Sequence, residues 1–116
     1  MEWDRSLEDL KDFKIINVDV YKQTKEMMND IIKKIPNLKP EKLMIFAIHL
    51  AYSTQRSKET NNIEEIDESL FNELKDEPNY DRALELCTDI IKKSKVEYTK
   101  IEKSYLLIHC CNLFRD

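Results

Sequence analysis

Two segments of this chain are apolar on nearly every side, and each of them carries one of its two histidines. The first segment, 43–56, has His49 in its middle, and the second, 101–114, contains His109. A helix without a polar face until its end is normally buried on several sides. The chain must therefore fold so that other helices, or a second copy of the chain, cover both segments.

The charged residues near the two histidines have mirror-image spacing. Arg56 follows His49 by seven positions, and Glu102 precedes His109 by seven positions. Seven residues are close to two helical turns, so each pair shares one face, with its members about 10 Å apart along the axis. One antiparallel register would therefore place His49 opposite His109 and Arg56 opposite Glu102, within one chain or across a dimer axis.

The length and composition exclude several classes of protein. A chain of 116 residues can bury an ordinary single-domain core without disulfides or metal. Glycine is absent, which argues against the glycine-rich phosphate loops of nucleotide-binding folds and against tight hairpins. The net charge is only −4 and the two signs are interspersed, so we expect no direct binding of nucleic acid.

Metal and cofactor sites are not expected either. Cys87, Cys110 and Cys111 fit neither a disulfide framework nor the spacing of zinc ligands, and we interpret them as small core residues. The two histidines could in principle share a metal ion. However, no carboxylate or cysteine lies three or four positions from His49 to complete such a site.

The polar N-terminus and the lack of any apolar run as long as a signal peptide or membrane span predict a cytoplasmic protein that does not enter a membrane. Residues 1–17 contain apolar residues at helical spacing, followed by β-branched residues that could form a short extended piece. We treat these residues as an N-terminal extension with a short helix, and residues 18–116 as the main helical domain.

Apolar periodicity and stop signals divide the main domain into five helices. Proline ends the first of them at Pro36 and begins the second at Pro40, and a polar stretch from Ser57 to Glu65 reads as a loop. The third helix is marked by Ile66, Leu70 and Leu74. The expected helices are about 19–35, 40–58, 66–74, 80–95 and from 100 onward.

Two helix starts have capping signals. Asn79 can cap the fourth helix. Thr99 and Glu102 form a capping box, in which the threonine oxygen accepts from the Glu102 amide and the glutamate reaches back to the Thr99 amide. The sequence therefore predicts an all-α bundle of five main helices in antiparallel pairs, with a short extra N-terminal helix.

The chain from about Asp19 to Phe114 resembles a PTS regulation domain, or PRD. These domains occur in bacterial antiterminators and transcription activators that respond to the sugar phosphotransferase system. One family signature, a histidine followed seven residues later by arginine, matches His49–Arg56, and a second, a glutamate and an apolar run leading to a histidine, matches Glu102–His109. Residues 80–85 resemble the start of the family's fourth helix.

Three features depart from the family pattern. Ile48 stands where many antiterminator members have an acidic residue, and no glycine follows Arg56. Family members usually join two such domains to a domain that binds RNA or DNA, whereas this chain has room for only one domain. Its output would therefore pass through a separate partner, such as a transcription regulator.

The resemblance implies that His49 and His109 are phosphorylated, with Arg56 and Glu102 in support. The phosphodonor would be the histidine-containing phosphocarrier protein or a sugar permease component. Structural roles remain open for all four residues: the histidines as core residues, Arg56 as a solvated cation at the helix end, and Glu102 as a cap.

We therefore expect a regulatory signalling module that forms a homodimer and whose association changes on phosphorylation. The alternative is a helical scaffold or adaptor with the same fold but without phosphoacceptor chemistry. An enzyme is not expected, because no set of nucleophile, base and orienting group can be assembled from the sequence. Since helix ends fray, we expect a charge at His49 to disturb the packing more than one at His109.

Overall fold

The computed structural model describes residues 2–59 and 72–115, and the regular secondary structure within these ranges is entirely helical. The predicted all-α fold is confirmed. The helices whose bounds fall in these ranges are α1 Glu2–Asp12, α2 Val18–Lys34, α3 Pro40–Glu59, α5 Tyr80–Lys93 and α6 Lys100–Phe114.

Part of the predicted loop and of the third helix lies outside the described residues. The loop expected over 57–65 is helical as far as Glu59, because α3 continues to that residue, and the rest of it is not described. Ile66 and Leu70 also fall outside the described ranges. Leu74 is helical and buried, in agreement with the expected end of that helix.

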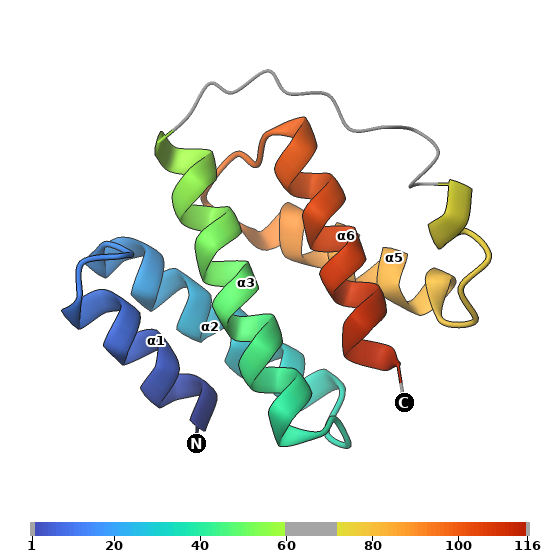
Figure 1. Cartoon of the computed structure of the whole chain (residues 1–116), viewed down its shortest axis with the longest axis horizontal. Coiled ribbons are helices and arrows are strands. Elements are labelled where there is room, and N and C mark those ends of the chain that lie inside the picture. The colour runs from blue at the N-terminus through green and yellow to red at the C-terminus, as the bar shows by residue number, and fades with distance from the viewer. Residues whose placement is uncertain (1, 60–71, 116) are drawn as a thin grey trace.

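Helix α3 is the central element of the bundle. It packs against α1, α2 and α6, and α5 in turn packs against α6. Figure 1 shows α3 and α6 side by side, with α1 and α2 on the opposite flank of α3. The apolar sequence of α3 is thus explained, because neighbouring helices cover it from both flanks.

A single hydrophobic core runs through the helices. Phe46 and Leu50 of α3 and Leu106 of α6 are among its fully buried side chains. The three cysteines are free and buried, as the sequence predicted. Not every apolar side chain on the two central helices is covered, since Ile45 and Tyr105 remain 51% and 37% exposed.

The N-terminal segment is part of this core. Trp3 and Leu7 of α1 are buried in the same cluster as the residues of α3. The β-branched residues after α1, which could have formed a short extended piece, lie instead in a turn and in the start of α2, because Asn17 caps α2 there. Its Oδ1 accepts a hydrogen bond of 2.8 Å from the amide of Val20, and the helix begins at Val18.

The turn between α1 and α2 shows how a chain without glycine ends a helix. Lys14 has a φ of 61°, the left-handed conformation that glycine usually supplies after a helix. The amide of Lys14 donates to the Lys11 carbonyl, and the amide of Ile15 donates to the Leu10 carbonyl, which is the Schellman arrangement. A residue with a side chain adopts this conformation at a cost of about 1 kcal/mol.

The start of α5 differs from the predicted capping. The side chain of Asn79 makes no capping hydrogen bond to α5. Instead, its Nδ2 donates to the carbonyl of Phe114 at 3.1 Å, and Arg115 pairs with Glu77 nearby. The last turn of α6 is therefore held in place by the segment that precedes α5.

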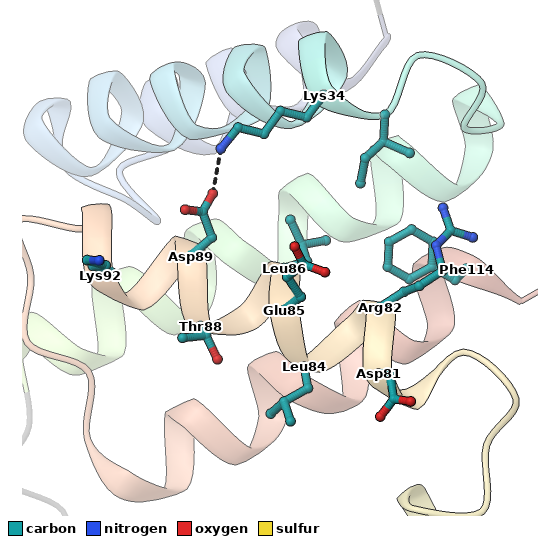
Figure 2. A pocket seen from close by; sticks show the side chains of 11 residues that line it. Lys34, Asp81, Arg82, Leu84, Glu85, Leu86, Thr88, Asp89, Lys92 and Phe114 are labelled. Atoms are coloured by element: carbon teal, nitrogen blue, oxygen red, sulfur yellow. Dashed lines mark hydrogen bonds and ion pairs between the residues drawn. The ribbon is translucent and has the colours of Figure 1, made fainter.

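Helices α2 and α5 meet through surface charges. Figure 2 shows Lys34 of α2 reaching Asp89 of α5, and the Nζ–Oδ2 distance is 2.7 Å. Lys93 makes a matching contact of 2.9 Å with Asp30. The same part of the surface contains a broad groove of about 760 Å³, lined by charges of both signs.

No helix of the described ranges is long and apolar enough to cross a membrane.

Candidate functional site

The antiparallel contact between α3 and α6 brings the two histidines together within one chain. The rings of His49 and His109 are stacked, with their centroids 3.9 Å apart and their planes 8° from parallel. Both side chains are half-buried. The register predicted from the mirror-image spacing is therefore observed, although phosphorylation of the two residues is a separate question.

The second pair of the predicted register is also formed. Arg56 Nε donates to Glu102 Oε2 at 2.9 Å, and Arg56 Nη2 donates to Oε1 at 3.0 Å. This two-pronged geometry is the strong form of an arginine–carboxylate contact. The Glu102 side chain is only 7% exposed, whereas that of Arg56 is 48% exposed. The pair thus fixes the α3–α6 register through a nearly buried carboxylate.

The capping box at the start of α6 is half correct. Thr99 Oγ1 accepts from the Glu102 amide at 3.3 Å, as predicted. The Glu102 carboxylate is not bonded to the Thr99 amide; its two oxygens accept hydrogen bonds from Arg56 instead. Arginine offers a charge and two aligned donors, which outweigh the single neutral amide of Thr99.

The surroundings of the histidines keep both rings neutral at neutral pH. Burial is the main cause that lowers the pKa of His49, and the positive charge of Arg56 adds to it. The pKa of His109 is lowered further, to about 4, by burial first and then by His49 and Arg56. A neutral imidazole has one ring nitrogen with a free lone pair, so both residues are available as nucleophiles.

The histidine pair opens onto a small surface depression of about 220 Å³. Its lining residues come from the first half of α3 and the last turns of α6: Lys42, Ile45, Phe46, His49, His109 and Asn112. Lys42 is the only cation in this lining, which contains no carboxylate. The depression therefore combines two neutral nucleophiles with one positive charge and one amide.

The tyrosines between the histidine pair and the ion pair differ in exposure. Tyr52 is half-buried, and Tyr105 is 37% exposed.

Sequence reasoning missed one polar contact of α3: Thr54 and Tyr98 share a buried hydrogen bond of 2.7 Å. It attaches the α5–α6 connection to α3. No local pattern could have found it, because its two residues are 44 positions apart.

No metal site is formed by the described residues. Within 2–59 and 72–115, no group of three or more histidine, cysteine, aspartate or glutamate side chains is placed to hold a metal ion. Cys87, Cys110 and Cys111 are buried in the core.

The family of this chain follows from its match to a known family model. A model of the PRD domain matches residues 25–112. The chain belongs to the PRD family. His49, Arg56, Glu102 and His109 all lie inside the matched range, whereas α1 and the first residues of α2 precede it. The PRD is a regulatory domain rather than a catalytic one. No curated protein and no solved structure matches the chain.

Proposed function

We propose that this PRD is a regulatory module of the sugar phosphotransferase system, in which the stacked pair of His49 and His109 accepts a phosphoryl group. The observation that carries the proposal is the pair itself: two neutral imidazoles, 3.9 Å apart, beside a surface depression with a positive charge. The donor is the histidine-containing phosphocarrier protein or a sugar permease component. The module acts in the cytoplasm and contacts neither nucleic acid nor membrane directly.

The transfer itself needs no cofactor. The lone pair of one ring nitrogen forms the new N–P bond while the N–P bond of the donor phosphohistidine breaks, and the donor nitrogen keeps the bonding electrons. The other nitrogen of the acceptor ring then releases its proton to water, and the donor ring takes up a proton from water to become a neutral imidazole. The depressed pKa values favour this step, because a protonated imidazole has no lone pair to offer.

Phosphorylation would alter a contact that is central to the fold. A phosphoryl group adds about two negative charges to a group that was neutral. The stacked rings lie between α3 and α6, and the carboxylate of Glu102, about two turns before His109 on α6, is already negative and nearly buried. A new dianion must therefore be paired with a cation or turned toward solvent, and either response changes this face of the domain.

The output of the module is a change in association. Ile45 lines the depression and is 51% exposed, and Tyr105 on α6 is 37% exposed. Apolar side chains next to the phosphoacceptor site suit a homodimer whose interface contains the site. The dimer, in its phosphorylated or unphosphorylated form, modulates a separate partner such as a transcription regulator.

Reconstituted phosphotransfer tests the proposal. The chain is incubated with the phosphocarrier, its upstream kinase and phosphoenolpyruvate, and its intact mass is measured at neutral or alkaline pH, where phosphohistidine survives. We expect the mass of a phosphoryl group to be added to the wild type and not to the double variant His49→Gln/His109→Gln. The single variants show which ring accepts it. An unmodified wild type would instead support a scaffold that kept the fold and lost the chemistry.

Sedimentation tests the association. We expect the unphosphorylated chain at about 100 µM to sediment as a dimer, and Ile45→Asp to shift it toward monomer. Phosphorylation should change the dimer fraction in the wild type. A clean monomer before and after phosphorylation would contradict this part of the proposal.

A further inference from the structure

The histidine pair lies between two cations on the same helix. Lys42 precedes His49 by seven residues, and Arg56 follows it by seven. Both are on α3, so each lies close to two turns from His49 on the same face, one toward each end of the helix. A phosphoryl group on either histidine could therefore be paired from one end or from the other.

The two cations are not equivalent. Arg56 already donates two hydrogen bonds to the carboxylate of Glu102, and this contact holds α3 against α6. Lys42 lines the same depression as both histidines, whereas Arg56 does not. Turning Arg56 toward a phosphate would leave the nearly buried Glu102 carboxylate without its counter-charge, which is costly.

We infer that the depression lined by Lys42 and Asn112 holds the phosphoryl group, with the Lys42 ammonium as its counter-charge and the Asn112 side-chain amide as a hydrogen-bond donor. This inference rests on the proposed function and adds the residues that receive the group. Arg56 then has a different role: it keeps Glu102 paired and the two helices in register.

The chemistry of the lining fits a dianion. Lysine carries a compact charge on a flexible stem and pairs with phosphate from variable positions. Asn112 lies three residues after His109 on α6, so the amide and that ring share a face. Ile45 and Phe46 supply an apolar wall, which lowers the local dielectric and strengthens the contact between ammonium and phosphate. No carboxylate in the lining opposes the added charge.

The test uses phosphoramidate, a small donor that phosphorylates histidine without a protein partner. Its N–P bond breaks as the ring nitrogen forms its own, and ammonia leaves. The variants are Lys42→Met and Lys42→Gln, with Lys42→Arg to retain the charge. The matched control is Lys39→Met, which removes the same charge from an exposed residue outside the lining. The initial rate of phosphoryl incorporation is followed by intact mass, and circular dichroism checks that each variant is folded.

We expect both neutral Lys42 variants to slow incorporation about tenfold, as for the loss of one charge-assisted hydrogen bond, and Asn112→Ala to slow it less. Lys39→Met and Lys42→Arg should remain close to the wild type. A ³¹P titration supplies a readout that a purely structural role would not change. Loss of the neighbouring ammonium should raise the second pKa of the bound phosphoryl group in the Lys42→Gln protein.

The inference and the proposed function fail in different ways. If the wild type is phosphorylated, and the neutral Lys42 variants match Lys39→Met in both rate and ³¹P titration, the inference is overturned and the proposed function stands. If the wild type accepts a phosphoryl group neither from phosphoramidate nor from the phosphocarrier, both are overturned.

Discussion

Helices α3 and α6 meet through a different kind of contact from the one that joins α2 and α5. Between α3 and α6 lie two neutral, stacked histidines and an ion pair whose carboxylate is nearly buried. Between α2 and α5 lie Lys34, Asp89, Lys93 and Asp30, with side chains between 33% and 46% exposed. Both contacts contain ion pairs with short distances, so distance alone does not separate them.

Burial is what separates them. An ion pair in water gains little, because solvent and salt screen both charges whether or not the pair is formed. A carboxylate that has lost its water depends on its partner, and removal of the partner leaves an uncompensated charge. We therefore expect the α3–α6 contact to control stability and response to charge, and the α2–α5 contact to be replaceable.

The largest expected effect comes from breaking the α3–α6 ion pair on one side. Arg56→Met should lower the free energy of unfolding by about 3 kcal/mol, because Glu102 keeps a charge that is nearly out of reach of water. Urea denaturation at pH 7 measures it. The double variant Arg56→Met/Glu102→Gln should recover part of the loss, and Lys58→Met on the same helix is the control. If Arg56→Met is as stable as Lys58→Met, burial of Glu102 does not make the α3–α6 ion pair important for stability.

The second effect is a loss of stability in acid. The pKa of His109 is lowered from 6.5 to about 4 in the folded protein, so the unfolded chain binds more protons as the pH falls through this interval. Stability should therefore be full above pH 6.5 and decline toward pH 4, by about 2–3 kcal/mol. The lowered pKa of His49 acts in the same direction.

Urea midpoints measured in steps across this pH interval check the acid effect. His109→Gln removes the main titrating group and should flatten most of the dependence. An equally steep profile in His109→Gln would show that other groups cause the loss.

A third, smaller effect compares the two histidines with each other. The sequence favoured His49 as the more sensitive position because helix ends fray, but the last turn of α6 is held: Phe114 is buried and its carbonyl accepts from Asn79. His109 also has the more strongly lowered pKa. We now expect His109→Asp to be less stable than His49→Asp by about 1 kcal/mol, because its charge is buried more deeply. Thermal melts of both variants at pH 7 measure the difference. If fraying of the last turn of α6 relieves the charge, His109→Asp should be as stable as His49→Asp or more stable.

The smallest effect is expected between α2 and α5. Asp89→Asn removes a carboxylate whose pKa is lowered mainly by the hydrogen bond from Lys34. Only a slight loss of stability should follow, and it should vanish in about 1 M salt, where exposed charges are screened. The loss in Arg56→Met should persist in the same salt. A salt-resistant loss in Asp89→Asn would mean that burial does not separate the two contacts.

The sequence predicted most of the described fold for reasons that are local. The apolar period and Pro36 and Pro40 located α2 and α3 to within a residue or two, because helix signals act over a few neighbouring positions. The alignment of His49 with His109 was also predictable, since two equal spacings in opposite directions admit an antiparallel register that satisfies both pairs. The part of the third helix outside the described residues remains a prediction.

Other features depended on partners distant in the chain. Glu102 looked like one half of a capping box, and Asn79 like a cap, because sequence shows only the nearest candidate partner. In the folded protein, the Glu102 carboxylate accepts hydrogen bonds from Arg56, and the Asn79 amide donates to the Phe114 carbonyl. The sequence did not mark Lys42 as a site residue, because a lysine in the first turn of a helix forms no pattern that predicts binding.

By itself, the sequence determined that this chain forms helices, where most of them begin and end, and which two segments must be buried on most sides. These properties follow from the apolar period, the prolines and the missing glycine. Tertiary structure alone decided the environment of each polar side chain: which carboxylate lost its water, which cation was left beside the histidines, and how far each pKa moved. Hydrogen-bond partners and desolvation are set by residues dozens of positions away, brought close only when the helices pack.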